Sequence, residues 1–273
     1  MPGRRPGPPR RRPPLRDERP RRADRAPRGL GGEQVEGRQA VRELLAAGRR
    51  RVREVWLAEG MDDSPLLAEI VDLAAAQRVP LKRVGRGRLD AAARTEAPQG
   101  VLAHAEPLPE ADLDDLARPN AFLLVLDGVT DPHNLGALLR TAECAGATGA
   151  VLPRHRAAHV TPAAAKAAAG AVEHVPLALV PGIPAALQRL RDQGVWTVGL
   201  SGEADRSLFD LDAALVRGPV ALVVGAEGAG LARLVRQRCD LLVRIPQHGR
   251  LDSLNVSAAG AVACFEVARR RSS

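Results

Sequence analysis

The sequence of 273 residues is poor in aromatic side chains, with two Trp, three Phe and no Tyr. An RNA-binding surface built from stacked aromatic rings is therefore not expected. Its three cysteines, Cys144, Cys239 and Cys264, stand far apart, without a CxxC pair or a companion cluster of histidines. That spacing argues against a metal site and against a disulfide framework, so a reducing cytoplasm is the expected location.

Long apolar runs are absent as well. No segment offers about 20 uninterrupted apolar residues, the length that spans a bilayer, and the first residues lack the apolar stretch of a secretory signal. The sequence thus predicts neither a membrane span nor secretion. Hydrophobic residues nevertheless make up 45% of the chain and charged residues 26%, which is typical of folded domains with real cores.

The excess of positive charge lies in one short segment. The whole chain carries a formal charge of +8, and residues 1–31 hold eleven Arg against three acids. These residues also contain eight of the 22 prolines and almost no large apolar side chains, so we expect a disordered tail. It serves either as an electrostatic arm for phosphate backbones or as a solvated extension without a specific role.

Beyond the tail, the pattern predicts two α/β domains joined by a linker. Residues 32–106 alternate short helices and strands, and two basic clusters at 49–53 and 82–88 are either a solvated rim or a local RNA contact. Residues 107–119 are acidic and interrupted by prolines, as expected of a linker. The elements expected in the first domain are helices at 37–47 and 64–77, a further short helix, and strands at 52–58, 80–84 and 100–107.

The strand candidates of residues 120–271 are longer and fully apolar, with helical segments between them. This pattern predicts a doubly wound parallel sheet, whose strands are buried on both faces. Ligands bind such sheets beyond the carboxyl ends of the strands, so the informative residues should follow strand ends. The expected strands are 122–129, 149–153, 175–180, 195–200, 220–225 and 241–246.

The first strand-end segment is DGVTDPHNLGALLRTAECAG, residues 127–146. It predicts a turn and then a helix that begins near Asn134 and carries Arg140 six residues later. Asn134 could be an ordinary N-cap residue, and Arg140 an ordinary exposed cation. Alternatively, Arg140 stands in an apolar stretch because it faces a partner or an anionic ligand.

Two further segments follow strand ends. VVGAEGAGL, residues 223–231, has GxxGxG spacing with Glu227 inside the turn, which fits neither a dinucleotide fingerprint nor a P-loop. IPQHGRLDSLNVSAAG, residues 245–260, places Ser253 and Asn255 at the start of the last helix, where helix capping alone would explain them.

Taken together, in this order and spacing, the three segments resemble the three motifs of the SpoU (TrmH) branch of the SPOUT RNA 2′-O-methyltransferases. The resemblance covers about residues 34–271, because residues 32–106 look like the L30e-like domain that binds RNA substrate in this branch. It implies a trefoil knot, S-adenosyl-L-methionine (AdoMet) as cofactor, and an obligate homodimer with active sites made by both subunits. The implied reaction is 2′-O-methylation of a ribose, most closely that of a guanosine in 23S rRNA.

The resemblance also assigns roles to single residues. Backbone positions that grip AdoMet would be Gly225, Ile245 and Leu254, with Leu200 touching the cofactor through a looser match. Gln247 and His248 depart from the residues usually found after the Ile-Pro of the third motif, and His133 and His248 are expected to be loop histidines, not bases. The catalytic positions would be Asn134, Arg140, Glu227, Ser253 and Asn255.

Arg140 is the residue that this family reading places at the reacting hydroxyl. A guanidinium has a pKa above about 12, so a neutral arginine base is costly to generate, and we expect Arg140 to stabilise developing negative charge instead. Other substrates stay open, namely a tRNA guanosine or an rRNA adenosine. A non-catalytic ribosome-assembly factor and a nucleotide-dependent oxidoreductase are the rival classes; the intact catalytic positions argue against the first and the missing GxGxxG against the second.

Overall fold

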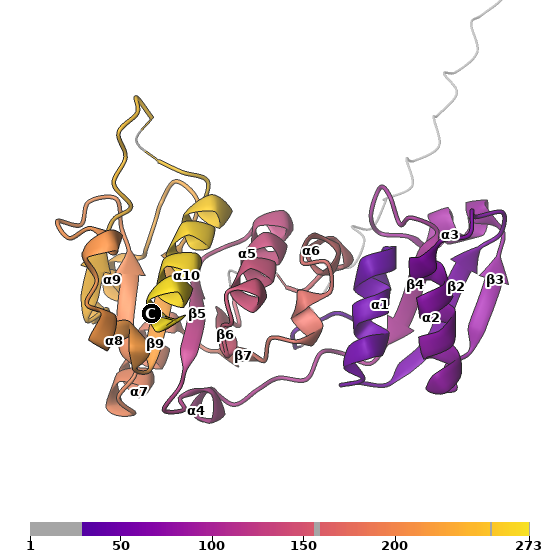
Figure 1. Ribbon diagram of the computed structural model, residues 1–273, viewed down its shortest axis with the longest axis horizontal. Helices are drawn as coiled ribbons and strands as arrows, with labels where there is room; N and C mark the ends of the chain where they lie inside the picture. The colour runs from indigo at the N-terminus through magenta and orange to yellow at the C-terminus, as the bar shows by residue number, and fades with distance from the viewer. Residues whose placement is uncertain (1–28, 156–158, 252, 273) are drawn as a thin grey trace, which may run out of the picture.

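The computed structural model describes residues 29–155, 159–251 and 253–272. Two β-sheets lie toward opposite ends of its long axis (Figure 1). The strands are β1 (Gln34–Glu36), β2 (Val52–Ala58), β3 (Leu81–Val84), β4 (Val101–Ala105), β5 (Phe122–Asp127), β6 (Gly149–Pro153), β7 (Leu177–Val180), β8 (Trp196–Leu200), β9 (Val220–Gly225) and β10 (Leu241–Val243). The α-helices are α1 (Arg38–Ala47), α2 (Pro65–Ala76), α3 (Arg86–Ala92), α4 (Leu113–Leu116), α5 (Pro132–Cys144), α6 (Pro162–Ala167), α7 (Ile183–Asp192), α8 (Ala213–Arg217), α9 (Arg233–Arg238) and α10 (Val256–Ser272), and the 3-10 helices are η1 (Ala171–Glu173) and η2 (Leu208–Asp210).

The smaller sheet belongs to residues 32–106, which we call the N-terminal unit, and has the order β1-β4-β2-β3. Side chains alternate across its strands, so β2 presents Val55 to α1 and α2 on one face and Trp56 toward α3 on the other. The expected helices and strands are present within a few residues of their predicted ends. The sequence did not predict β1, because three residues are too short to show an alternating pattern.

The larger sheet belongs to residues 120–271, the C-terminal unit, and has the order β10-β8-β9-β5-β6-β7. Every neighbouring pair in it is parallel. Helices α5, α6 and α10 pack on one face, and α4, α7 and α9 pack on the other. The predicted doubly wound parallel sheet is therefore confirmed, whereas the trefoil knot stays a prediction.

The strand order reverses at the centre of this sheet. β5 is the first of its strands in the chain, yet it lies between β6 on one side and β9 on the other. The last residues of β5 and β9, Asp127 and Gly225, are partners in register. A crevice at such a reversal is where doubly wound sheets bind their ligands.

The predicted tail and linker differ in part from the structure. Residues 1–28 lie outside the described residues, but Leu30 is buried in the core of the C-terminal unit and Gly31 pairs with Val160. The prediction of disorder is thus wrong for these last tail residues, because Leu30 carries an apolar side chain that the core accepts. In the expected linker, Leu113 and Leu116 of α4 are buried against the larger sheet. Among the described helices, none is both long and apolar enough to cross a membrane.

Candidate functional site

Three polar side chains from distant parts of the chain meet beyond the central strands of the larger sheet. Nδ2 of Asn134 donates to Oε2 of Glu227 at 3.2 Å. Nδ2 of Asn255 donates to Oδ1 of Asn134 at 3.2 Å and lies 3.3 Å from Oε1 of Glu227. The structure therefore brings together one residue of each predicted strand-end segment.

The turn after β5 places the first of these residues. Asp131 is the N-cap of α5, its side chain accepts the backbone N–H of Asn134 at 2.8 Å, and Pro132 follows at the first helical position. Asn134 thus lies in the first turn of α5 and is not the cap. Its side chain is left available to contact Glu227 and Asn255.

Asn255 uses both ends of its side-chain amide. Oδ1 accepts from the backbone N–H groups of Ser257 and Ala258, at 2.9 and 3.4 Å, and from the hydroxyl of Ser257 at 2.6 Å. Helix capping, the plainer explanation for this residue, is therefore real. The opposite end, Nδ2, is directed to Asn134 and Glu227, so capping and site assembly occur in the same side chain.

The glycine-rich turn after β9 is fixed by close backbone packing. A Cβ added at Gly225 would lie 2.2 Å from the carbonyl carbon of Gly230, so no side chain fits there. Ala226 and Gly230 exchange backbone hydrogen bonds of 3.0 and 2.9 Å. Oδ2 of Asp127, at the end of β5, accepts the N–H of Ala232 at 2.7 Å. Sequence reasoning gave Asp127 no role; its signal is a carboxylate at the end of the central strand.

A pocket of about 510 Å³ opens beside this turn. Its volume lies within the range that small-molecule ligands occupy. All three predicted cofactor positions and Leu200 line it, together with Glu227 and Ser253. The predicted members are Leu200, Gly225, Glu227, Ile245, Ser253 and Leu254.

Two of the described residues that were predicted to be catalytic, Ser253 and Arg140, form no hydrogen bond with the joined side chains of Asn134, Glu227 and Asn255. Ser253 is exposed at the pocket rim. Arg140 is exposed on α5, and its side chain makes no hydrogen bond or ion pair among the described residues. At about 100° per residue, six residues separate the directions of Asn134 and Arg140 by roughly 120° around α5. The chain by itself does not bring Arg140 to the joined side chains.

The thiols offer no activated nucleophile near this pocket. Burial raises the pKa of Cys239, with a smaller contribution from Asp240, and burial raises that of Cys264; both reach about 12. The pKa of Cys144 is also raised, by partial burial and by Glu143. Within the described ranges, no group of three side chains could hold a metal ion.

Comparison with known proteins gives this arrangement a family. The model of the SpoU rRNA Methylase family matches residues 121–265. The chain belongs to the SpoU rRNA methylase family. A second model, described as RNA 2′-O ribose methyltransferase substrate binding, matches residues 34–111.

Relatives of this SpoU protein match it over nearly their whole length. It is 44% identical to the 23S rRNA (guanosine-2′-O-)-methyltransferase RlmB of Pseudomonas syringae pv. tomato, over 88% of this chain and 96% of that protein. It is 43% identical to the protein of the same name in Pseudomonas aeruginosa, over 88% and 97%. Among solved structures, the SpoU methyltransferase AviRb from Streptomyces viridochromogenes, in complex with AdoMet, is 25% identical with a TM-score of 0.73, over 87% of this chain and 90% of that one.

Proposed function

We propose that this protein is an AdoMet-dependent methyltransferase that modifies the ribose 2′-hydroxyl of a guanosine in 23S rRNA. The observation that carries the proposal is the pocket beyond the carboxyl ends of β8, β9 and β10, which Glu227 lines and to which Asn134 and Asn255 are linked through their hydrogen bonds to Glu227. The names of the relatives supply the base and the RNA. The second matched region, residues 34–111, supports an RNA substrate that needs a binding unit of its own.

The pocket fits AdoMet in size and in lining. Gly225, Ile245 and Leu254 line it, and we assign them to the cofactor through their backbone groups. Leu200 and Leu254 add apolar surface, as expected beside an adenine ring. When bound, AdoMet supplies an electrophilic methyl group.

The protein must then position the ribose and stabilise charge on its oxygen. Asn134, Ser253 and Asn255 would orient the ribose, and Glu227 would hold the amides of Asn134 and Asn255 in place. Arg140 would hold the developing alkoxide or an adjacent phosphate. The exchange Arg140→Lys keeps the charge but loses the planar fork, so kcat should fall on the order of 100-fold in a methyl-transfer assay. Near-normal turnover would remove any special role for the guanidinium.

We further propose a cytoplasmic homodimer in which Arg140 serves the partner's pocket. Helices α5 and α10 lie side by side (Figure 1). Arg140 is exposed on α5, and α10 exposes Val262 and Phe265, one helical turn apart. A second copy covering these apolar side chains would bring Arg140 to a neighbouring site. The N-terminal unit would bind RNA, residues 107–119 would link it to the methyl-transfer unit, and a trefoil knot would shape the cofactor loops.

The deciding experiment incubates the protein with radiolabelled AdoMet and with separate pools of unmodified rRNA and tRNA, and then maps the modified ribose. We expect label on one guanosine of 23S rRNA. Label in tRNA alone, or on an adenosine, would overturn the substrate. Absence of transfer to either pool would overturn the enzymatic activity and favour a non-catalytic assembly factor.

A further inference from the structure

The N-terminal unit is tied to the C-terminal unit by a buried ion pair. Arg50 follows α1, and Glu173 ends η1 on the other side of the junction. Nη2 of Arg50 lies 2.5 Å from Oε1 of Glu173, and Nε donates to Oε2 at 3.0 Å. Their side chains are only 3% and 1% exposed. The pair is thus bidentate, which fixes direction as well as distance.

The same guanidinium also binds the two places where the chain passes between the units. Nη1 of Arg50 donates to the carbonyl of Gly32 at 2.7 Å and to the carbonyl of Glu106. Gly32 lies just before β1, and Glu106 lies just after β4. The Arg50 side chain therefore contacts the segment that enters the N-terminal unit, the segment that leaves it, and Glu173 of the C-terminal unit.

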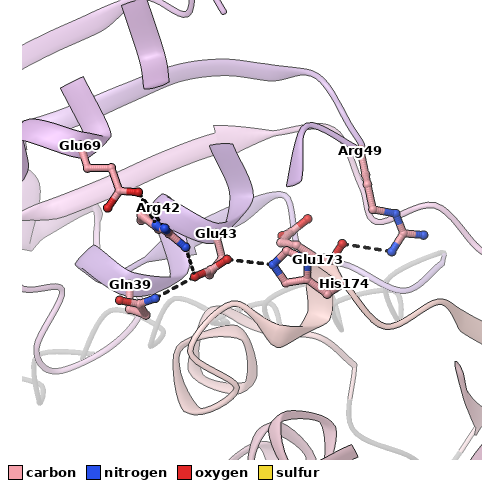
Figure 2. Close-up of polar contacts among 7 residues, drawn as sticks. All are labelled: Gln39, Arg42, Glu43, Arg49, Glu69, Glu173 and His174. Carbon is pink, nitrogen blue, oxygen red and sulfur yellow. Dashed lines mark hydrogen bonds and ion pairs between the residues drawn. The ribbon is translucent and has the colours of Figure 1, made fainter. Parts of the chain in front are cut away.

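Figure 2 shows further contacts across the junction, made by Glu173 and His174 with Arg49 and Glu43. Arg49 donates to the carbonyl of Glu173 at 3.0 Å, and Nε2 of His174 lies 2.8 Å from Oε2 of Glu43 on α1. Backbone packing is equally close, since a Cβ at Gly170 would lie 2.4 Å from the Cβ of Glu43. α1 therefore meets η1 directly, and the orientation of the two units is set by several contacts.

Stability alone gives little reason to bury two opposite charges. Removing ions from water is costly, and apolar pairs of similar volume often replace a buried ion pair without loss of stability. What a bidentate pair adds is a single allowed geometry. That geometry matters here because the RNA-binding unit and the methyl-transfer pocket must act on one RNA at the same time.

We propose that Arg50 and Glu173 are positioning residues that hold RNA, bound to the N-terminal unit, in register with the methyl-transfer pocket. They act through the orientation of the unit and touch neither the cofactor nor the reacting ribose. This inference rests on the proposed function. It extends that function by placing part of the selection of the target nucleotide at the junction between the units.

The test uses the full-length protein, a 23S rRNA transcript and the variant Glu173→Gln, which keeps the shape of the side chain but removes its charge. We expect KM for the transcript to rise at least tenfold, while kcat and the dissociation constant of AdoMet stay within twofold. Amide hydrogen exchange should become faster in peptides covering 29–36 and 104–112 and stay unchanged in peptides covering 222–231. The matched control is Asp114→Asn, which removes the negative charge from the Arg189–Asp114 ion pair between α4 and α7, on the sheet face opposite η1, and should change none of these values.

The double variant Arg50→Met/Glu173→Met separates positioning from stability, because it removes both charges and leaves an apolar pair. We expect it to fold, with a melting temperature lowered only by the loss of the hydrogen bonds to the carbonyls of Gly32 and Glu106, and still to show the raised KM. The positioning role would be overturned if the double variant had the KM of the wild-type protein. It would equally be overturned if Glu173→Gln showed faster exchange at the junction but an unchanged KM. If the wild-type protein transfers no methyl group at all, the proposed function fails; unchanged exchange at the junction in Glu173→Gln would then overturn the inference independently.

Discussion

Asn255 shows how much of the site depends on one amide group. Its oxygen caps α10 and its nitrogen contacts Asn134 and Glu227. An amide is needed because a carboxylate could accept from the helix N–H groups but could not donate to Glu227. The two roles can therefore be separated by substitution.

Asn255→Asp should keep the cap and place a negative charge against Glu227, whereas Asn255→Ala should lose both functions. We expect methyl transfer to fall at least about tenfold in both variants. Only the alanine variant should also lose about 1 kcal/mol of stability, the usual value of an N-cap. Thermal melts beside activity assays check this, and equal melting temperatures in the two variants would contradict the capping role.

Gly225 is a second residue whose replacement has a defined effect. Gly225→Ala would drive a methyl group into the backbone of Gly230 and displace the glycine-rich turn. AdoMet affinity, measured by calorimetry, should fall about tenfold or more, since the cofactor contacts proposed for this turn are made by backbone groups. The control is Gly218→Ala, where an added Cβ would lie 3.5 Å from its nearest neighbour, the carbonyl oxygen of Leu215, and affinity should not change.

For single residues, the sequence predicted which side chains come together at the strand ends better than it predicted their geometry. Asn134, Glu227 and Asn255 follow strand ends, and parallel strands bring their carboxyl ends to one edge, so their meeting could be anticipated. The isolated position of Arg140 could not, because the direction of a side chain around a helix depends on where the helix begins. The predicted start near Asn134 was late; α5 begins at Pro132.

Near its carboxyl end, helix α10 carries Glu266, which forms ion pairs with Arg269 and Arg270. Hydrogen bonds from Arg269, and then from Arg270, outweigh burial and lower the pKa of Glu266. Glu266 is mostly buried, and Arg270 also binds the backbone carbonyls of Phe209 and Leu211 near η2. This cluster fastens the last helix to the segment before α8.

Because the pKa of Glu266 is lowered in the folded protein, the stability that it contributes depends on pH. As the pH falls below about 5, the unfolded chain takes up the Glu266 proton before the folded chain does, so the stabilisation is lost. Glu266→Gln should lower the melting temperature at pH 7, and the difference from wild type should shrink toward pH 4. Glu59→Gln, an exposed acid without an ion pair among the described residues, should show no such trend. A constant difference across this range would contradict the assignment.

Element prediction failed where elements are short or leave the regular pattern. β1 spans three residues, and α4 forms a single turn in a segment expected to be a linker. Both are stabilised by contacts with distant residues, such as the pairing of Glu36 with Leu102. Propensity over a short window cannot report such contacts.

For the whole molecule, the proposed homodimer is the assembly that can be tested most directly. Phe265→Glu should place a charge in the proposed interface on α10 and yield a species near 28.9 kDa in light scattering, with methyl transfer lost. Phe265 does not line the proposed AdoMet pocket, so an unchanged affinity for AdoMet would show that the variant is folded. Leu234→Glu on α9, over the opposite face of the sheet, should leave the assembly unchanged.

The positive net charge of the whole molecule comes from residues 1–31 and not from the two units. The N-terminal unit with α4 and its flanks, residues 32–118, carries 13 basic and 16 acidic residues, and residues 119–273 carry 16 and 13. The folded parts are therefore nearly neutral, and net charge does not explain how they would select RNA. Local basic clusters such as residues 82–88, the shape of the surface and the proposed positioning of the two units are means of selection that do not depend on net charge.

The central place of β5 also sets the order in which the protein can become functional during synthesis. β5 is synthesised first among the strands of the larger sheet, but one of its two edges stays unpaired until β9 has been synthesised. Asn134 is separated by 93 residues from Glu227 and by 121 from Asn255. Such long-range closure is slow, and a nascent chain without its last helix cannot complete the pocket. The enzyme would thus be inactive until its translation is finished.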